Sequence, residues 1–461
     1  MTSTASALTI SFLALLLSAC PDGSPVKSGE VAPDTTSDTT ADTSPDTRPD
    51  TLDDTADTTD TADTTDTEVP DSPDTDDTPD TTDTTDTTDS TDTPDTTDTD
   101  TTPPPPTEVM RVHVLDVGQG EAILVEFPCG AMLIDTGGEV TPASENATAF
   151  DSVEALDSQL RAFFASRPDL ENTLDLVVLT HPHIDHTRGV ERLVELVDDG
   201  ELTISHIVTN GAEGSGSGVL QQRILHDFAD RLNIPRWYVL ERKARPDGLV
   251  NDIIDPFPAC ARTPGATAID PEITALWGRI DQASSLSSTW SEDDLDNGNN
   301  HSVVLRIAFG EASALFPGDL ETAGIGELIR TFWSTGLLDI DLYKAGHHGS
   351  YNGTTAGLVN TMSPELAVIS AGPPHRTGDW TAWSYGLPRW AAVSDMLGDN
   401  DSDGVALMRS PAITVPIGTS WNGEHGVFTD KQVPGAVYST GWDGALSITL
   451  FPDGAIALPA R

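Results

Sequence analysis

The sequence predicts an α/β fold in which two β-sheets are flanked by helices. Short apolar runs of strand length alternate with segments whose apolar residues recur every three or four positions, the period of a helix that buries one face. Several apolar runs are followed at once by loops rich in histidine, aspartate and glycine. Binding and catalytic residues often lie on loops that a rigid scaffold positions, so these loops form the candidate site.

The first residues of the chain predict export. Residues 5–17 form an apolar run that is too short to span a bilayer, and they end in Leu17-Ser18-Ala19-Cys20. This ending resembles the lipobox of bacterial lipoproteins. The resemblance implies that residues 1–19 are a signal peptide and that Cys20 is the lipidated first residue of the mature protein. An ordinary signal peptide cleaved near Ala19 is the alternative.

Residues 20–108 are predicted to be a disordered tether. They repeat Asp-Thr and Asp-Thr-Thr units, with too few apolar side chains to offset the entropy of ordering. Residues 21–108 carry 27 acidic and 2 basic side chains, which leaves a net charge of −27 out of −52 for the rest of the chain. Because phosphate binding normally depends on lysine and arginine, tight binding of nucleic acid is disfavoured. We expect a cell-envelope protein, anchored through Cys20 on the periplasmic face of a membrane or at the outer-membrane or cell surface.

The folded part, residues 109–461, is predicted to be a mixture of strands and helices and to act as a monomer. Strands are expected at 110–117, 122–127, 132–134, 205–209, 237–240, 303–309, 314–316, 366–370 and 445–450, and helices at 152–164 and 190–197. The stretch 247–300 is rich in glycine, serine and aspartate towards its end, which predicts a loop-rich insertion at one edge of a sheet.

Two cysteines, Cys129 and Cys260, are left once Cys20 is assigned to the lipid anchor. An exported protein meets oxidising conditions, under which these two thiols can pair as a disulfide. Two buried free thiols are the alternative.

The most informative motif follows the apolar run 176–179. It reads Thr180-His181-Pro182-His183-Ile184-Asp185-His186 and places four potential metal ligands within six residues. A tight loop with this spacing can turn His181 and His183 towards one cation and leave Asp185 and His186 facing a second. Imidazole nitrogen and carboxylate oxygen together favour zinc. A polar surface loop with neighbouring histidines is the alternative.

Two later motifs also follow apolar strands. Asp319 ends the run Leu315-Phe316-Pro317-Gly318, where one carboxylate can bridge two cations, although alone it would be interpreted as a turn aspartate bonded to backbone amides. The glycine-rich turn after Lys344 contains His347 and His348, which can supply one ligand and one proton donor.

These motifs, in this order, resemble the metallo-beta-lactamase fold, and more narrowly the hydrolase domain of ComEC-type competence proteins. The resemblance covers about residues 110–461 and depends on LDVGQGEA (115–122), LIDTGG (133–138), THPHIDH (180–186), NNHSVVL (299–305), PGD (317–319) and HHGS (347–350). The tail over 438–445 looks like the strand pair that closes these domains. The resemblance implies an αβ/βα four-layer sandwich with a dinuclear metal site at one edge of its two sheets.

The resemblance also implies a role for each candidate residue. His181 and His183 would bind the first metal ion, and Asp185 and His186 the second, with Asp319 between the two ions. Either His347 or His348 would complete the second site. Asp135 would lie behind the ligands and orient one of them.

One position departs from the wider superfamily. A further histidine is expected about twenty residues before the bridging aspartate, where this chain has Asn299 and Asn300, as the ComEC-type group does. Asn300 is therefore expected beside the ligands, and His301 is the adjacent candidate replacement. The first site should be the weaker one and should favour manganese or loosely held zinc; a mononuclear enzyme is the alternative.

Together these assignments predict an exported, metal-dependent hydrolase. Water held between two dications has its pKa lowered towards ~7, so it can attack without a dedicated base. Asp185, Lys344 and His347 are the candidate catalytic residues, with Lys344 and the non-ligand histidine stabilising or protonating the leaving oxygen. The expected substrate is a phosphodiester in nucleic acid or a phospho-decorated polymer, or a related ester. A lactone or lactam hydrolase, and a surface-displayed binding module with a structural metal site, are the alternatives.

Overall fold

The structure is a computed structural model that describes residues 108–142, 149–212, 216–240, 252–280, 286–399 and 402–458. The predicted signal peptide, the lipidation site Cys20 and the tether up to residue 107 lie outside the described residues. Within the described part of the chain, no helix combines the length and the apolar character needed to cross a membrane.

The first sheet has the strand order β10-β9-β7-β3-β2-β1-β20-β21. Its strands are β1 (Met110–Val114), β2 (Ile123–Phe127), β3 (Gly130–Ile134), β7 (Leu176–Leu179), β9 (Ile207–Thr209), β10 (Arg236–Tyr238), β20 (Leu446–Leu450) and β21 (Ile456–Ala457). β1, β2 and β3 pair antiparallel, whereas β3, β7, β9 and β10 run parallel. β7 is buried at every position, as expected for a parallel strand that is covered on both faces.

The second sheet has the strand order β11-β12-β13-β14-β15-β16-β19. Its strands are β11 (Asp252–Ile254), β12 (Glu272–Trp277), β13 (Val304–Phe309), β14 (Ala312–Phe316), β15 (Leu342–Lys344), β16 (Leu366–Ile369) and β19 (Val437–Ser439). From β14 to β19 the neighbouring strands are parallel.

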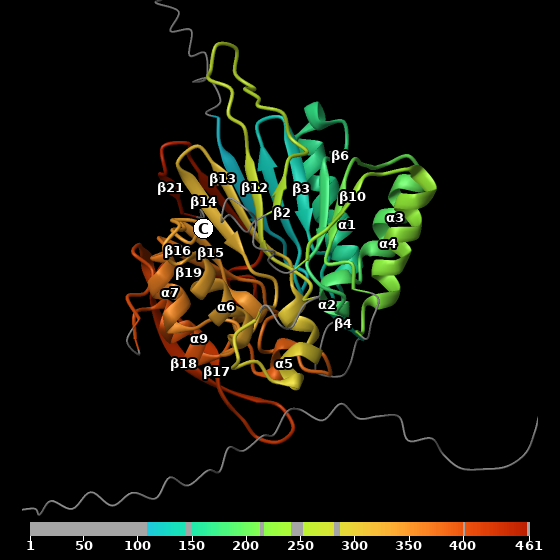
Figure 1. The fold of residues 1–461 in the computed structure, drawn as a ribbon. Coiled ribbons are helices and arrows are strands. Elements are labelled where there is room, and N and C mark those ends of the chain that lie inside the picture. Colours follow the sequence, from blue (N-terminus) through green and yellow to red (C-terminus); the bar gives the residue numbers. More distant parts are fainter. Residues whose placement is uncertain are drawn as a thin grey trace, which may run out of the picture. The chain divides into compact units, whose positions relative to one another are not determined.

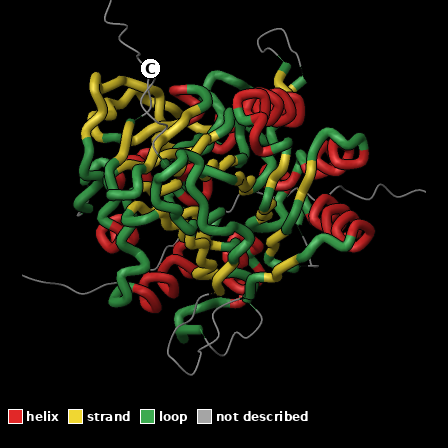
Figure 2. Tube along the Cα trace, turned by 90° about the horizontal axis from the view of Figure 1, so that it is seen from above, coloured by secondary structure: helices red, strands yellow, loops and turns green. Residues whose placement is uncertain are grey.

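Helices cover the outer face of each sheet. α1 (Ser152–Ser166), α3 (Val190–Asp198) and α4 (Val219–Leu232) lie on the first sheet, and α6 (Thr322–Phe332), α7 (Ala356–Met362) and α9 (Trp390–Met396) lie on the second (Figure 1). Seen from above, helices lie on opposite sides of the strands (Figure 2). Three buried apolar clusters fill the spaces between the layers: one between the two sheets and one under each set of helices. The predicted αβ/βα four-layer sandwich is therefore confirmed.

All of the predicted strands and helices are present, with ends that differ by at most three residues. The shorter elements are β4 (Val140–Thr141), β5 (Phe150–Asp151), β6 (Thr173–Leu174), β8 (Thr203–Ile204), α2 (Ile184–Thr187), α5 (Glu292–Asp296), α8 (Ala382–Tyr385) and α10 (Thr440–Asp443). Within the stretch 247–300, predicted to be a loop-rich insertion at one edge of a sheet, β11 and β12 form the edge of the second sheet. β12 is buried at five of its six positions against its neighbours.

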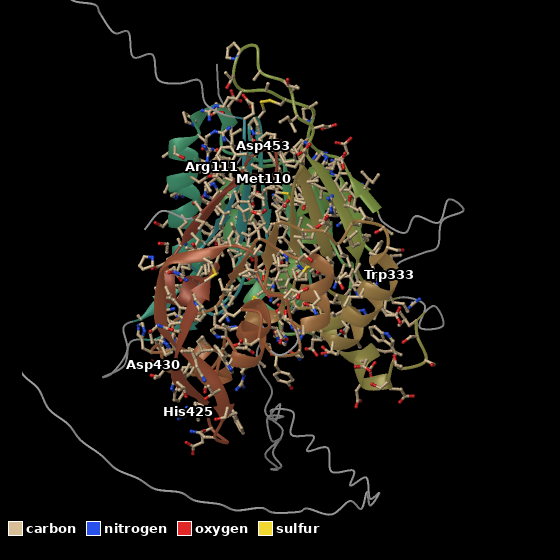
Figure 3. All side chains as sticks on the ribbon, turned by 90° about the vertical axis from the view of Figure 1, so that its left-hand side faces the viewer. Met110, Arg111, Trp333, His425, Asp430 and Asp453 are labelled. Carbon is tan, nitrogen blue, oxygen red and sulfur yellow. A yellow bond between two sulfur atoms is a disulfide. The ribbon has the colours of Figure 1, made fainter. Side chains whose placement is uncertain are left out.

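A long hairpin was not predicted. It consists of β17 (Met408–Trp421) and β18 (Gly426–Gly435), and His425 lies at its turn (Figure 3). Most of its residues are exposed or half-buried, and β17 contains Pro411 and Pro416. The two prolines interrupt the strand pattern, although Ile413, Val415 and Ile417 alternate and pack against the apolar cluster under the helices of the second sheet.

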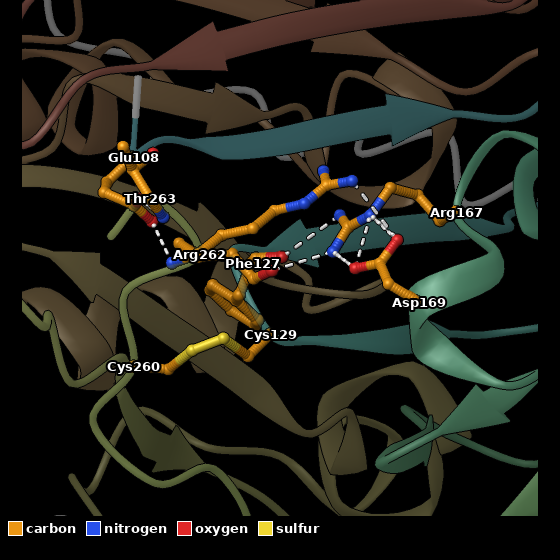
Figure 4. The surroundings of a disulfide bond; sticks show 9 residues. Glu108, Phe127, Cys129, Arg167, Asp169, Cys260, Arg262 and Thr263 are labelled. Atoms are coloured by element: carbon orange, nitrogen blue, oxygen red, sulfur yellow. Dashed lines mark hydrogen bonds and ion pairs between the residues drawn. A yellow bond between two sulfur atoms is a disulfide. The ribbon is translucent and has the colours of Figure 1, made fainter. Parts of the chain in front are cut away.

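Cys129 and Cys260 form a disulfide, the first of the two alternatives that the sequence left open (Figure 4). Their Cα atoms lie 6.1 Å apart, within the usual range for a disulfide. The bond joins the turn between β2 and β3 to the segment before β12, across 131 residues of sequence. A cross-link over so long a loop restricts the unfolded chain and typically stabilises a protein by about 2–5 kcal/mol.

Glu126, on β2, lies among three basic side chains. His113 Nε2 is 3.0 Å from Glu126 Oε2, and Arg111 donates to Oε1 at 3.1 Å. Arg167 also donates to Oε1 and pairs with Asp169 near the disulfide (Figure 4). Burial alone would raise the pKa of Glu126, but the hydrogen bond from His113 and the charges of Arg111 and Arg167 lower it to about 2. The ionised carboxylate therefore stabilises the fold.

We expect Glu126→Gln to lower the free energy of unfolding at pH 7 and to matter less in acid. The folded-state pKa lies below the ordinary value of 4.5, so ionised Glu126 contributes stability above about pH 4.5 that is lost as the pH falls through about 2. The shift corresponds to on the order of 3 kcal/mol at pH 7. Urea titrations of both proteins at pH 7 and pH 3 measure the difference. A difference that is as large at pH 3 as at pH 7 would contradict this role.

Candidate metal centre

The candidate ligands lie where parallel strands of both sheets end at one edge. Asp135 follows β3 and the loop 181–186 follows β7, its parallel neighbour in the first sheet. Asp319 follows β14, and His347 and His348 follow β15, its parallel neighbour in the second sheet. The topology therefore brings loops that are far apart in sequence to one place between the sheets.

Four side chains form the tightest group. Ligand atoms of Asp185, His186, Asp319 and His348 all lie within 4.8 Å of one another. His186 Nε2 is 3.2 Å from both His348 Nε2 and Asp319 Oδ2. His348 Nε2 is 3.3 Å from Asp185 Oδ2, and the Asp185 side chain is 30% exposed while the other three are buried. Of the two adjacent histidines, it is His348 that joins this group.

Hydrogen bonds behind the group determine which ring nitrogens face it. His348 Nδ1 lies 2.9 Å from the carbonyl oxygen of Ser370, which can only accept, so Nδ1 carries the proton. His186 Nδ1 lies 2.7 Å from Asp135 Oδ2, which favours the same tautomer. In the neutral rings both Nε2 atoms therefore point lone pairs at each other and at carboxylate oxygens. Such electron-pair donors repel one another unless a positive charge lies between them.

In the absence of a metal ion, protons supply that charge. Burial alone would lower the pKa of His186, but the charges of Asp319 and Asp135 raise it well above its ordinary value. Burial alone would raise the pKa of Asp319, but the charges of His186 and His348 hold it well below its ordinary value. The group is thus built to hold positive charge, and a bound cation would displace a proton.

A second, more open group shares Asp319. His181 Nε2 lies 3.0 Å from His183 Nδ1 and 3.9 Å from Asp319 Oδ2. The same oxygen is 3.2 Å from His186 Nε2, so it lies between the two groups. The other oxygen, Asp319 Oδ1, is buried and has no hydrogen-bond partner among the described residues. Converging imidazole nitrogens and an unpaired buried carboxylate oxygen fit divalent metal ions.

Asp135 holds the ligand loop from behind. It is fully buried, and it accepts hydrogen bonds from the Thr180 backbone N–H at 2.8 Å and from Thr180 Oγ1 at 2.7 Å. Its carboxylate also contacts His186 Nδ1, so one side chain positions both the start and the end of the loop. Its backbone φ of 58° is left-handed, an uncommon conformation for a residue other than glycine.

His347 lies at the mouth of the group. Its side chain is 24% exposed, and Nε2 is 3.8 Å from Asp319 Oδ2. Nδ1 lies 3.1 Å from Asn352 Oδ1 and 3.5 Å from Glu321 Oε1. His347 and His348 both have left-handed backbone conformations, with φ of 47° and 52°. This strained turn sends one ring into the buried group and the other towards solvent.

The role predicted for Lys344 is corrected. Its side chain is fully buried, and Nζ donates to Glu121 Oε2 at 2.6 Å and to the carbonyl oxygen of Ala345 at 2.9 Å. Glu121 is equally buried and lies in the loop between β1 and β2, so the ion pair joins the two sheets. A lysine held in this way does not reach a leaving group. It balances the charge of a carboxylate close to Asp135 and His186.

Asn300 and His301 support a loop and face away from the metal ligands. Asn300 Nδ2 donates to a carbonyl oxygen of α5 at 3.0 Å, and its Oδ1 accepts from the backbone N–H of Glu321. Both ring nitrogens of His301 are bonded to backbone atoms, at 3.0 and 2.8 Å. The suggestion that His301 replaces a ligand is therefore wrong.

Glu321, which lies near the site, was not predicted. Glu321 accepts a hydrogen bond from Asn299 Nδ2 at 2.7 Å and faces His347. Asn299 Oδ1 is buried without a partner in the described part of the chain. A Cβ atom on the preceding Gly298 would lie only 3.0 Å from His183 Nε2, so this loop lies against the first group. The signal that the sequence offered for Glu321 was an acidic side chain only two positions after the candidate ligand Asp319.

Comparisons with known proteins agree with this geometry. Residues 115–372 match the model of the metallo-beta-lactamase superfamily. ComE operon protein 3 of Bacillus subtilis is 26% identical over 267 residues, which cover 58% of this chain and 29% of that protein. Recombination protein 2 of Haemophilus influenzae is 33% identical over 87 residues, 19% of this chain and 10% of that protein. The resemblance predicted from the motifs is confirmed.

Among solved structures, the metallo-beta-lactamase fold protein YhfI from Bacillus subtilis is 14% identical, with a TM-score of 0.30, over 57% of this chain and 85% of that one. The chain spans less than a third of the length of the two curated relatives.

We expect Lys344→Met to destabilise the fold by about 3–5 kcal/mol, because it leaves the Glu121 carboxylate buried without its partner. The double variant Lys344→Met/Glu121→Gln should recover much of this loss, since it removes the unpaired charge. Urea unfolding of the three proteins measures both effects. A Lys344→Met protein that keeps its stability and loses only activity would restore the catalytic role instead.

Proposed function

The chain belongs to the metallo-beta-lactamase superfamily, whose members are metal-dependent hydrolases, and on this premise we propose that it hydrolyses a phosphodiester, or a closely related ester, outside the cytoplasm. The observation that carries the proposal is the position of Asp319 Oδ2, 3.2 Å from His186 Nε2 and 3.9 Å from His181 Nε2. A carboxylate oxygen that faces two ligand groups suits a pair of cations, and paired cations suit phosphoryl transfer.

Bound divalent ions would supply a hydroxide at neutral pH and neutralise the charge that develops on the attacked group. The chain's own residues would position the metal ligands and protonate the leaving oxygen. Asp135 and Ser370 fix the rings of His186 and His348 so that their Nε2 atoms face the second site. We assign to His347 the transfer of a proton to the leaving oxygen. Its Nδ1 faces two acceptors and keeps its proton there, so when both ring nitrogens are protonated the transferable proton is the one on Nε2, which lies 3.8 Å from Asp319 Oδ2.

We propose zinc for the group of Asp185, His186, Asp319 and His348, which offers two nitrogen and two oxygen ligands. The group of His181 and His183 has fewer donors. If Asn299 Oδ1 joined it, the added hard oxygen would favour manganese there.

A phosphodiester is the preferred substrate class for two reasons. One relative is called a recombination protein, and recombination acts on DNA, whose backbone is a phosphodiester. The paired ligand groups suit in-line displacement at phosphorus. The net charge of −27 outside the tether repels a long polyanion, so we propose a small phosphodiester or an exposed end of a chain as the substrate.

We expect the protein, supplied with zinc or manganese, to hydrolyse bis-p-nitrophenyl phosphate, and His183→Ala to lower kcat/KM by at least about 100-fold because a metal ligand is lost. His206→Ala is the matched control. His206 bonds to the carbonyl oxygen of Asp175 at the opposite end of β7, so its loss should leave the rate unchanged. The rate of p-nitrophenol release by the wild type and the two variants measures these effects. Stoichiometric metal with no turnover, or equal turnover in His183→Ala, would contradict the proposal.

We also propose that the mature protein is lipid-anchored in the cell envelope through Cys20, as the motif at residues 17–20 suggests. Wild-type cells should incorporate labelled palmitate into the protein, and Cys20→Ala should abolish the label. Ser24→Ala, outside the motif, should be labelled normally. Equal labelling of the wild type and Cys20→Ala would show that the anchor assignment is wrong.

A further inference from the structure

An exposed aromatic pair occupies a strained segment of the chain. Trp380 is 60% exposed, and Tyr385, at the end of α8, is 39% exposed. Their ring centroids lie 6.3 Å apart, edge to face. Trp380 has a left-handed φ of 62°, an unfavourable conformation for a bulky residue. Burial does not explain this conformation, because the side chain it presents is mostly in solvent.

One end of this segment is fixed beside the metal ligand Asp185. Arg376 Nη1 lies 3.1 Å from Glu139 Oε1, and its guanidinium covers the Phe150 ring at 3.8 Å. Glu139 follows Gly138, which packs so closely on the backbone of Asp185 that no side chain would fit there. The segment therefore begins against the loop that borders Asp185.

The other end is fixed beside the metal ligand His348. The backbone N–H of Arg389 donates to the carbonyl oxygen of Gly349 at 2.9 Å. Pro388 packs on Gly349, with 2.8 Å between its Cβ atom and the position of a Cβ on the glycine. Gly349 directly follows His348, whose Nε2 lies 3.3 Å from Asp185 Oδ2.

The segment 376–389 thus runs from the loop beside Asp185 to the loop of His348, and these two ligands touch. Trp380 and Tyr385 lie between two fixed ends that both border the metal centre. An electrostatic effect agrees with this placement. Burial raises the pKa of the Tyr385 hydroxyl, and the charge of Asp185 raises it further.

We propose that Trp380 and Tyr385, which we call the aromatic platform, bind a planar ring carried by the substrate, such as a nucleobase, while its phosphate occupies the metal centre. This inference rests on the proposed function and specifies part of the substrate. Exposed aromatic rings stack on any base, because every base has a π face. Asp185 and Asp379 place negative charge near Tyr385, which would repel a phosphate there. The platform is therefore suited to the uncharged ring and the metal centre to the phosphate.

Two pairs of small phosphate compounds distinguish binding of the ring from binding of the phosphate. AMP and ribose 5-phosphate differ only in the base, and phenyl phosphate and methyl phosphate differ in an aryl ring against a methyl group. Calorimetry on the full-length, manganese-loaded protein should show AMP binding about 10-fold more tightly than ribose 5-phosphate. Trp380→Ala should bring this ratio below about 2-fold without weakening ribose 5-phosphate, and Trp380→Phe should keep part of it. A ring preference in both pairs supports a platform for any planar ring, and a preference in the AMP pair alone supports a nucleobase site.

Trp333→Ala is the matched control. Trp333 is also exposed, at 70%, but it follows the last turn of α6, roughly 16 Å along the helix from the end near Asp319 (Figure 3). The Trp333→Ala variant should leave unchanged both affinity ratios, that of AMP to ribose 5-phosphate and that of phenyl phosphate to methyl phosphate. Equal binding of AMP and ribose 5-phosphate by the wild type, or an unchanged ratio in Trp380→Ala, would overturn the aromatic platform alone. Failure of the wild type to bind any of the four phosphates would overturn the proposed function together with it.

Discussion

The convergence of unpaired electron-pair donors between the two sheets is the constraint on which the rest of this domain depends. His186, His348 and Asp319 are buried within about hydrogen-bond distance of one another, and the neutral rings aim lone pairs inwards. Such an arrangement is costly to bury unless positive charge balances it. The surrounding structure therefore has to hold these groups against their own repulsion.

The fold meets this requirement through contacts behind the ligands. Asp135 and the carbonyl oxygen of Ser370 fix the outer nitrogens of the two rings, so the rings are not free to turn away. The buried ion pair of Lys344 and Glu121 joins the second sheet, at the end of β15, to the loop between β1 and β2 of the first sheet. Because parallel strands of each sheet end at this edge, loops from distant parts of the sequence reach the site without long excursions.

The sequence allowed the two sheets and the ligand loop 181–186 to be predicted, because each depends on a local pattern: an apolar strand followed by closely spaced ligands. The choice between His347 and His348 depends on two successive left-handed residues, which the residue types do not encode. The partner of Lys344 is 223 residues away, so no local signal marked the pair. The hairpin β17–β18 was not predicted, because two prolines interrupt the short alternation of Ile413, Val415 and Ile417 on its first strand.

The mouth of the site differs in character from its interior. Inside, buried carboxylates and imidazoles suit cations and a phosphate. Outside, the segment 376–389 presents aromatic rings to solvent and is fixed at both ends beside ligands. In the proposed function, this division lets an acidic domain select a small ring-bearing ester without attracting polyanions in general.

The metal centre itself is tested most directly by calorimetric titration of the metal-free protein with zinc or manganese, in buffers of different ionisation enthalpy. Uptake of two equivalents, with release of protons from the ligands, is the result that the geometry predicts. No saturable uptake of either ion would contradict it.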